Sequence, residues 1–439
     1  MADRVTVIGW DGSPPTDAAR AALGAASLVA GAAHHLDLPE VPPGAERIRL
    51  GSVGLAARRI ARHRGSAVVL ADGDPGFFGV VRTLRAPEHG LEVEVLPAVS
   101  SVAAAFARAG MPWDDAQVVV AHERNLRRAV NVCRAHPKVA VLTSPGAGPA
   151  ELALLLRDVH RTFVICEELG GRQERVTVLT SDKVADHVWR DPNVTLVIGG
   201  GIGSGAGAVP AAAGTAGAPG APGAPGQGAA GQPAAGGWLA GHDAGYPPAL
   251  RGWSLAPAEY AAAPDEGEAP QLRAVQLARL GPRQGDLVWD IGSGSGAAAV
   301  EAARFGAAVI AVDRDPDACA RAAAAARRFG VLLQTVHGTA PGVLNDLPEP
   351  DVVRVGGGGA AVVAECAARR PERIVAHART RDAAEEVVRA LSDAGYAVEC
   401  SLLQSVDLDP DAPADAGQGT GWRERERTVV FLIAGSRGS

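Results

Sequence analysis

Aromatic residues are scarce in this chain. They make up 4% of its 439 residues, so any hydrophobic core must be built mainly from Ala, Val and Leu. Lysine is scarcer still, because it occurs only at Lys138 and Lys183, and arginine supplies almost all of the 42 basic residues. The net charge of −7 argues against a protein that wraps nucleic acid, because phosphate binding needs a positive field. We therefore expect no nucleic-acid partner, whereas a small anionic ligand held by local arginines is compatible with this charge.

Paired cysteines and long apolar runs are also missing. The five cysteines are scattered and form no Cys-x-x-Cys motif, so the sequence predicts free buried thiols in a reducing cytoplasm rather than disulfides or a metal site. The longest apolar run, at about residues 21–33, is short and rich in Ala and Gly. It predicts no membrane span, and the residues before it have no secretory-leader pattern.

A segment without charged or aromatic residues divides the chain. Residues 199–237 are almost entirely Gly, Ala and Pro. Such a composition buries too little apolar surface to offset the entropy of ordering, so we expect a flexible linker. The sequence therefore predicts two independently folding domains, at residues 1–198 and 238–439.

Short apolar runs alternate with helical patterns in the first of these domains. Thr16 is placed to cap an Ala-rich helix that we expect to reach about Ala30. The alternation predicts an α/β layer with ligand sites at the carboxyl ends of its strands. Strands are expected at residues 4–9, 67–71, 91–96, 117–121, 139–143, 162–166, 175–180 and 194–199.

Three of the expected strand ends carry distinctive turns. They are Gly9-x-x-Gly12, the run Asp72–Gly79 (DGDPGFFG), and Pro97–Ser101 (PAVSS). Taken singly, each is usually no more than a turn. In this order and spacing they resemble the tetrapyrrole methylase family, and Met111–Asp115 and Cys166–Gly170 fit the same pattern. The resemblance covers most of residues 4–199, and its details resemble the branch that methylates the meso carbon C5 of a corrin precursor.

This resemblance implies a cleft for S-adenosylmethionine. The implied cofactor-binding residues are Gly9, Gly12, Gly73, Asp74, Pro75, Ser100 and Ser101. Asp74 fits either a cofactor contact or a helix cap beside Pro75. The first loop departs from the usual Gly-x-Gly-Pro-Gly, and His122-Glu123-Arg124 replaces His-Gly-Arg.

Arginines follow the fourth main strand of this domain. A solvated helix face is the favoured interpretation of such clusters. The alternative is that Arg124 and Arg127, which follow a strand end on the ligand side, hold substrate carboxylates through their bidentate guanidinium groups.

The second domain opens with a strand that ends in an acid and three alternate glycines, Asp290–Gly296 (DIGSGSG). A second strand ends in Asp313, which is placed to bind ribose hydroxyls. The glycine spacing also fits a dinucleotide-binding fingerprint, but a carboxylate at Asp290 would repel a pyrophosphate. It suits the amino group of S-adenosylmethionine, so we favour a methyltransferase over a dehydrogenase.

Further strands are expected at residues 332–338, 351–355 and 373–377. Two long closing strands, 396–405 and 428–434, form an antiparallel hairpin typical of class I methyltransferases. Residues 273–434 resemble a decarboxylating precorrin methyltransferase domain, although the leading segment Ala269–Arg273 (APQLR) keeps only the arginine of the family pattern. His337 and His377 are conceivable bases, but core or surface roles are favoured, and no catalytic residue is assigned. The resemblance implies cofactor contacts at Asp290, Gly292, Ser293, Gly294, Gly296, Asp313, Gly338, Thr339 and Ala340, and substrate contacts at Gly356, Gly357 and Gly358.

Together these resemblances imply an α/β fold class: a tetrapyrrole methylase fold of two lobes, followed by a Rossmann-like class I methyltransferase. They imply methylation of precorrin-6B at C5 and C15, with loss of the ring-C acetate carboxyl group, to give precorrin-8 in cobalamin biosynthesis. S-adenosylmethionine is the implied cofactor, and a homo-oligomer is expected because such domains tend to self-associate. Two alternatives stay open: a single active domain, and a tetrapyrrole-binding protein without turnover.

Overall fold

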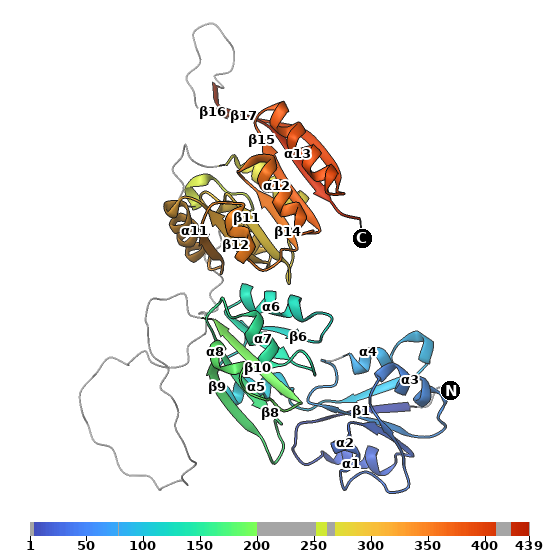
Figure 1. Cartoon of the computed structure of the whole chain (residues 1–439). Coiled ribbons are helices and arrows are strands. Elements are labelled where there is room, and N and C mark those ends of the chain that lie inside the picture. Colours follow the sequence, from blue (N-terminus) through green and yellow to red (C-terminus); the bar gives the residue numbers. More distant parts are fainter. Residues whose placement is uncertain (1–3, 78, 200–251, 261–267, 410–422, 439) are drawn as a thin grey trace, which may run out of the picture.

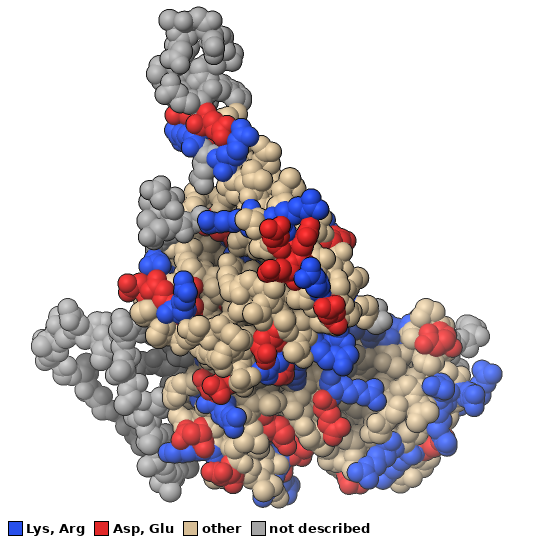
Figure 2. Space-filling model, turned by 45° about the horizontal axis from the view of Figure 1, so that its top comes forward, with Lys and Arg blue, Asp and Glu red and all other residues tan. Residues whose placement is uncertain are grey.

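The computed structural model describes residues 4–77, 79–199, 252–260, 268–409 and 423–438 (Figure 1). They form two lobes followed by a second domain, drawn from blue to green and from yellow to red. The predicted linker lies outside the described residues, apart from Gly199, which ends a strand. Among the described residues, no helix is long and apolar enough to cross a membrane. On the face seen in Figure 2, acidic and basic side chains are interspersed rather than segregated.

Lobe 1 contains a parallel sheet of five strands in the order β3-β2-β4-β1-β5. Because the strands are parallel, their carboxyl ends meet along one edge. The elements are β1 (Arg4–Trp10), α1 (Asp17–Gly24), β2 (Leu28–Gly31), α2 (Ala33–Leu36), β3 (Glu46–Arg49), α3 (Val53–Arg62), β4 (Ala67–Asp72), α4 (Val80–Leu84), the 3₁₀ turn η1 (Pro87–His89) and β5 (Glu92–Leu96).

The first helix is shorter than its sequence predicts. Thr16 caps it as expected, since its Oγ1 accepts a hydrogen bond of 3.2 Å from the Ala19 backbone N–H. The helix ends at Gly24, however, and not near Ala30. The next residues form β2, which is buried along its whole length between β3 and β4. Burial between two neighbours, which a local pattern does not reveal, makes this short segment a strand.

Lobe 2 contains a mixed sheet in the order β6-β7-β10-β8-β9, in which only the β6–β7 pair is parallel. Helix α5 (Ser101–Ala109) leaves the last strand of lobe 1 and packs Val102 and Phe106 against this sheet, which joins the two lobes. The remaining elements are β6 (Gln117–Val120), α6 (Leu126–Ala135), β7 (Lys138–Leu142), α7 (Pro149–Leu155), β8 (Arg161–Glu167), β9 (Arg175–Thr180), α8 (Ser181–Val184) and β10 (Asn193–Gly199).

The second domain is a seven-stranded sheet in the order β13-β12-β11-β14-β15-β17-β16. The first five strands are parallel, and the closing hairpin is antiparallel, as predicted. Its elements are η2 (Pro257–Tyr260), α9 (Pro270–Leu280), β11 (Leu287–Ile291), α10 (Ala297–Arg304), β12 (Ala308–Asp313), α11 (Pro316–Phe329), β13 (Gln334–His337), η3 (Gly342–Asp346), β14 (Val352–Val355), α12 (Gly359–Ala368), β15 (Arg373–Ala378), α13 (Arg381–Asp393), β16 (Ala397–Asp409) and β17 (Arg423–Ser436).

The cores are aliphatic, as the composition requires, and the cysteines are all free. Burial raises the pKa of the Cys133, Cys166 and Cys366 thiols to about 12. The prediction of buried thiols holds for these three, whereas Cys319 is half-buried and Cys400 is exposed.

Helix α6 of lobe 2 contacts the second domain. The Asn131 side-chain amide donates hydrogen bonds to the Gly285 carbonyl at 3.0 Å and to Asp351 Oδ2 at 3.3 Å. Arg127 forms an ion pair with Asp351 at 3.1 Å. Gly285 and Asp351 precede β11 and β14, so this contact lies at the amino ends of the parallel strands. The glycine loops at their carboxyl ends lie at the opposite edge of the sheet.

Candidate functional site

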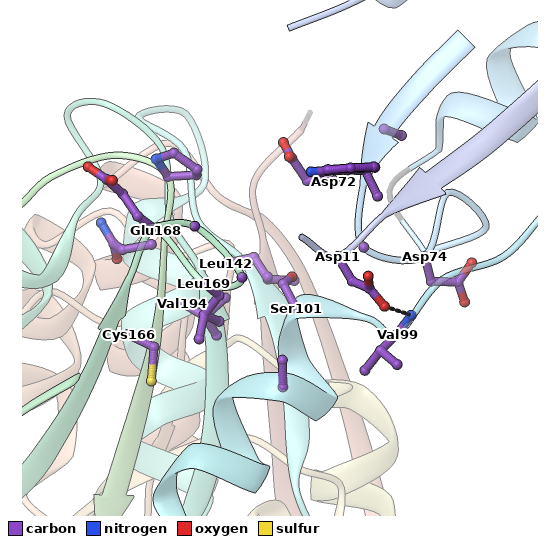
Figure 3. Close-up of a pocket in the computed structure, with 18 of the residues that line it drawn as sticks. Asp11, Asp72, Asp74, Val99, Ser101, Leu142, Cys166, Glu168, Leu169 and Val194 are labelled. Atoms are coloured by element: carbon purple, nitrogen blue, oxygen red, sulfur yellow. Dashed lines mark hydrogen bonds between the residues drawn. The ribbon is translucent and has the colours of Figure 1, made fainter. Parts of the chain in front are cut away.

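A cleft of about 910 Å³ separates the two lobes of the first domain (Figure 3). In the close-up, Asp11 and Asp72 of the first lobe lie across the cleft from Glu168 and Leu169 of lobe 2, and Ser101 lies between the two sides. The lobe 1 wall is built from residues at or just after the carboxyl ends of its five strands. Ligands of parallel sheets bind at the carboxyl ends of the strands, which we call the ligand edge, so the cleft lies where a ligand is expected.

Close backbone approach explains two of the predicted glycines. A Cβ atom on Gly9 would lie 2.3 Å from the Gly73 carbonyl oxygen. Gly12 has a φ of +85°, and a Cβ there would lie 2.0 Å from the Gly170 carbonyl oxygen of lobe 2. Neither residue lines the cleft. Gly9 lets two loops of lobe 1 pack together, and Gly12 lets a lobe 1 loop approach lobe 2 behind the wall of the cleft.

Four other predicted residues do line the cleft: Gly73, Asp74, Pro75 and Ser101. Asp74 Oδ1 also accepts a hydrogen bond of 2.8 Å from the Gly76 backbone N–H, so it stabilises its own turn while facing the cleft. Ser100 is the N-cap of α5, with its hydroxyl accepting from the Ala103 N–H at 3.1 Å.

Sequence reasoning missed Asp11, which joins two loops of this wall. Its carboxylate accepts hydrogen bonds from the backbone N–H groups of Ser13 at 3.0 Å and Val99 at 3.2 Å; the second is the dashed line in Figure 3. Partial burial alone would raise the pKa of Asp11, but these backbone hydrogen bonds outweigh it and lower the pKa. The position of Asp11 between two glycines was the available signal.

A second missed group consists of His34, His35 and Asp72. His34 Nε2 lies 2.9 Å from Asp72 Oδ1, and His35 Nε2 lies 3.0 Å from the same oxygen. Burial alone would raise the pKa of Asp72, but the hydrogen bond from His34 and the close contact with the His35 ring outweigh it and hold the pKa well below its usual range. The hydrogen bond to Asp72 in turn raises the pKa of His34. The sequence predicts the end of a helix where β2 lies, so it gives no sign that this strand brings the tandem histidines to the cleft.

The two candidate substrate arginines lie elsewhere. Arg124 is exposed and does not line the cleft. Arg127 faces the second domain, where it pairs with Asp351 and donates a hydrogen bond to the Glu349 carbonyl oxygen. In this structure Arg127 joins the two domains, and its contact with a substrate carboxylate stays a prediction.

The glycine loop of the second domain has the expected form. Gly292, Gly294 and Gly296 all have positive φ, at +72°, +58° and +77°. A Cβ on Gly296 would lie 2.5 Å from Ala322 Cβ, so this glycine lets α10 pack against α11. Space is open at Gly294, whose N–H donates to Asp313 Oδ2 at 2.8 Å. A ligand at this loop would therefore contact both Gly294 and Asp313.

Asp290 is already paired. It is 1% exposed, its Oδ1 lies 2.6 Å from Arg354 Nη1, and its Oδ2 accepts a hydrogen bond of 2.8 Å from the Ser293 hydroxyl. The predicted ammonium contact of Asp290 would have to compete with these two partners. Sequence reasoning missed Arg354, although a charged residue inside the valine-rich strand β14 signals a buried partner.

Arg354 also contacts Glu268, at 2.8 Å, and Gln276, whose Oε1 accepts a hydrogen bond of 2.7 Å. Burial opposes the charge on Arg354, but Glu268 and Asp290 outweigh it and raise its pKa. Burial would likewise raise the pKa of Glu268, and its pairing with Arg354 lowers it instead. We call Glu268, Gln276, Asp290 and Arg354 the buried polar cluster.

His377 borders this cluster. Its Nδ1 lies 3.1 Å from Gln276 Nε2 and 3.7 Å from Glu268 Oε1. Burial lowers the pKa of His377, which keeps the ring neutral near pH 7. The paired acid that the sequence did not reveal is thus Glu268. His337 is exposed, and its Nε2 lies 3.1 Å from the Arg314 carbonyl oxygen.

The remaining predicted contacts lie in two loops beside the glycine loop. Gly338 donates its N–H to the Asp313 carbonyl at 2.9 Å, and Thr339 and Ala340 follow it. Gly356 packs against the glycine loop, because a Cβ there would lie 2.6 Å from the Gly292 carbonyl oxygen. Gly357 has open space around it, and Gly358 caps α12 with a φ of +93°. These loops follow neighbouring strands and share one edge of the sheet.

Comparison with known proteins finds a matching family for each of the two domains. A family model of tetrapyrrole (corrin/porphyrin) methylases matches residues 6–185, and one described as a precorrin methyltransferase domain matches residues 269–434. The precorrin-6Y C(5,15)-methyltransferase [decarboxylating] of a Sinorhizobium species is 32% identical over 419 residues, which cover 93% of this chain and 90% of that protein. The chain belongs to this family of decarboxylating precorrin methyltransferases.

Two shorter relatives each match part of the chain. The cobalt-precorrin-7 C(5)-methyltransferase of Salmonella typhimurium strain LT2 is 36% identical over 170 residues, covering 37% of this chain and 81% of that protein. The probable cobalt-precorrin-6B C(15)-methyltransferase (decarboxylating) of Pyrobaculum calidifontis is 38% identical over 142 residues, covering 30% of this chain and 73% of that protein. These matches agree with the family assignment, and the sheets of the structure confirm the predicted α/β fold class.

Proposed function

We propose that this chain methylates precorrin-6B at C5 and C15 and removes the ring-C acetate carboxyl group, which yields precorrin-8 for cobalamin biosynthesis. The observation that carries the proposal is the match to a decarboxylating C(5,15)-methyltransferase along 90% of that protein's length. Each domain has its own set of loops at the carboxyl ends of parallel strands. Two such places for a ligand support two methylation steps. Self-association and a cytoplasmic location stay predictions.

The first domain is proposed to perform the C5 step in the cleft between its lobes. S-adenosylmethionine, when bound, supplies an electrophilic methyl group. The open cleft, the glycine turn at Gly73 and the side chains of Asp74 and Ser101 fit a ligand that combines a nucleoside with an amino acid. Holding two reactants in line contributes roughly 7–11 kcal/mol to such a reaction. Positioning by the two facing walls is therefore the main catalytic task of this domain.

The second domain is proposed to perform the C15 step and the decarboxylation. Asp313 and the open space at Gly294 fit a ribose at the glycine loop. Asp290 reaches the cofactor's amino group only by sharing its carboxylate with Arg354 and Ser293. When the carboxyl group leaves as carbon dioxide, its bonding electrons pass to the conjugated ring. The buried polar cluster provides fixed charges beside the carboxyl ends of the parallel strands of this domain.

The test uses S-adenosylmethionine with a ¹³C-labelled methyl group. The full chain should add two labelled methyl groups to each macrocycle and release one equivalent of carbon dioxide. Mass spectrometry counts the methyl groups, and ¹³C NMR separates C5 from C15. One methyl group without gas would show that only the first domain acts, and binding of the macrocycle without any transfer would indicate a carrier protein.

An Asp290→Asn variant tests whether the sites are separate. Loss of the charge that faces Arg354 should abolish C15 methylation and gas release while C5 methylation continues. Equal loss of both products would contradict two separate sites.

A further inference from the structure

Among the described residues that line the cleft, one group is used neither by the loop packing nor by the proposed cofactor contacts. It consists of His34, His35 and Asp72. The histidines lie on α2, immediately after β2, and Asp72 ends β4, so two neighbouring strands bring them together at the ligand edge. We call this group the histidine–aspartate cluster.

The hydrogen bonds of the cluster fix where the protons lie. Asp72 is ionised, because its pKa is held well below the usual range, so it can only accept hydrogen bonds. His34 Nε2, at 2.9 Å from Asp72 Oδ1, must therefore carry a proton. In a neutral ring the other nitrogen, Nδ1, is then the basic one. Nδ1 of His34 makes no hydrogen bond within the described part of the chain, and 51% of the side chain is exposed.

His35 differs from its neighbour. Its side chain is 1% exposed, and its Nδ1 accepts a hydrogen bond of 3.3 Å from the Ala32 backbone N–H. A neutral His35 must therefore carry its proton on Nε2, which lies 3.0 Å from Asp72 Oδ1 in a poorly aligned contact. His35 is closed to a ligand, and it helps to hold the carboxylate that orients His34.

These proton positions argue against a metal ion, although the three side chains lie close enough to share one. A histidine that binds a metal through Nε2 keeps its proton on Nδ1. In His35 that proton would point at the Ala32 N–H. The cluster instead has the arrangement of a base oriented by a carboxylate.

The proposed C5 reaction needs such a base. Forming the new C–CH₃ bond breaks the CH₃–S bond of the sulfonium donor, whose sulfur keeps the electron pair, and leaves positive charge on the macrocycle. Neutrality returns when a proton leaves the methylated carbon or a ring nitrogen and its bonding electrons stay in the ring. The proposed C5 methylation thus releases one proton within the cleft.

We propose that His34 is the general base of the C5 methylation, taking this proton on Nδ1, and that Asp72 is the positioning residue that fixes its tautomer and stabilises the resulting imidazolium. This inference rests on the proposed function. The exposed part of His34 returns the proton to water.

Other titratable groups near the cleft are poorer bases. Asp11 is tied to two backbone N–H groups that lower its pKa, and burial raises the pKa of Cys166 to about 12, so its thiol stays protonated. Arg108 is paired with Glu174. The remaining charged groups that face the cleft or act on His34 are Asp37, Asp74, Glu168 and Asp191.

The decisive experiment compares His34→Gln with His89→Gln, whose histidine lies on η1 and does not line the cleft. Transfer of labelled methyl to C5 should fall about 100-fold or more in His34→Gln, the range that a positioned base contributes. C15 methylation by the same chain and calorimetric affinity for S-adenosylmethionine should stay at the wild-type values, as should all three readouts in His89→Gln.

The pH dependence gives a readout that a structural role would not change. Only neutral His34 accepts a proton, so the C5 rate should rise with pH through the raised pKa of His34 and then level off. His34→Gln should lose this rise, and imidazole should restore part of the C5 rate in His34→Gly. Asp72→Asn should shift the rise to lower pH. NMR of the ligand-free chain should show His34 protonated on Nε2 with a raised pKa that Asp72→Asn lowers.

The failures are distinguishable. If the wild-type chain methylates neither carbon, the proposed function fails. If it methylates both and His34→Gln keeps the C5 rate and the pH profile, the base assignment is overturned. Equal losses of C5 rate and cofactor affinity would make His34 a binding residue instead. One tightly held metal ion per wild-type chain, lost in His34→Gln together with C5 activity, would show a metal site and also overturn the inference.

Discussion

The two domains place their charged groups in opposite ways at the carboxyl ends of parallel strands. In the first domain Asp74 and His34 line an open cleft and keep part of their bonding capacity free. In the second domain Asp290 and Arg354 are buried and paired with each other. An open cleft leaves groups ready for a substrate, whereas a buried pair gives a fixed local charge and makes each partner depend on the other.

The largest expected effect comes from removing one partner of the buried ion pair in the second domain. Arg354→Met leaves Asp290 and Glu268 buried without their common cation. We expect the free energy of unfolding of the second domain to fall by about 3–5 kcal/mol, the cost of removing one partner of a buried pair. Urea denaturation with hydrogen exchange resolved by domain measures this, and C5 methylation should survive.

The matched control is Arg381→Met, which removes an exposed arginine that pairs with Glu385 one helical turn away. Such a pair contributes about 0–1 kcal/mol. Similar losses in both variants would show that the buried polar cluster does not stabilise the second domain.

The next effect concerns the contact between the lobes. Gly12→Ala places a Cβ against the Gly170 carbonyl at a φ of +85°, whereas Gly79→Ala meets open space at a similar φ of +79°. Both variants carry the backbone strain of a positive φ. The clash alone should therefore lower the free energy of unfolding of Gly12→Ala by about 1–3 kcal/mol more than that of Gly79→Ala. Thermal unfolding and C5 methylation measure it. Equal costs would mean that the lobes do not need this close approach.

Glu268 in the second domain and His34 in the first should contribute to stability with opposite pH dependence. The pKa of Glu268 lies below its ordinary 4.5, so its stabilisation is present above pH 4.5 and is lost as the pH falls through the folded pKa. The pKa of His34 lies above its ordinary 6.5, so its stabilisation is present below pH 6.5 and is lost as the pH rises through the raised value. Denaturation resolved by domain should show both trends, and Glu268→Gln and His34→Gln should each remove one.

The smallest expected effect belongs to Arg127→Ala. Its ion pair with Asp351 is half exposed, so the stability of the chain should change by less than about 1 kcal/mol. Because Arg127 contacts the second domain and not the cleft, KM for the macrocycle should stay within about threefold of the wild type. A tenfold rise in KM would instead support the predicted substrate role of Arg127.

Much of the fold could be predicted because its signals are local. The strand that begins at Leu287, the acid Asp290 near its end and the three glycines stand close together in the chain, and the structure contains the strand and the glycine turn. The segment Leu28–Gly31 was missed because four residues carry too little pattern, and burial between β3 and β4 decides its conformation. Local propensity gives way to tertiary burial in such short segments.

The candidate site was predicted as separate turns, without the partners that complete them. Asp290 was expected to be open to a cofactor, but Arg354, which is 64 residues further along the chain, already pairs with it. His34 and Asp72 are 38 residues apart and meet only because β2 and β4 are neighbours. Strand order, which no single segment encodes, decides which side chains share a charge.

By itself the sequence determined the class of the fold and the glycine turns that follow its parallel strands. These features depend on residues within a few positions of one another, where backbone sterics and apolar periodicity act. Only the tertiary structure decided that Gly12 meets Gly170 and that Arg354 pairs with two carboxylates. It also decided that Asp72 contacts His34 Nε2, which leaves Nδ1 as the basic nitrogen of that ring. Electrostatic and packing energies depend on distance in space, and folding brings together what the chain keeps apart.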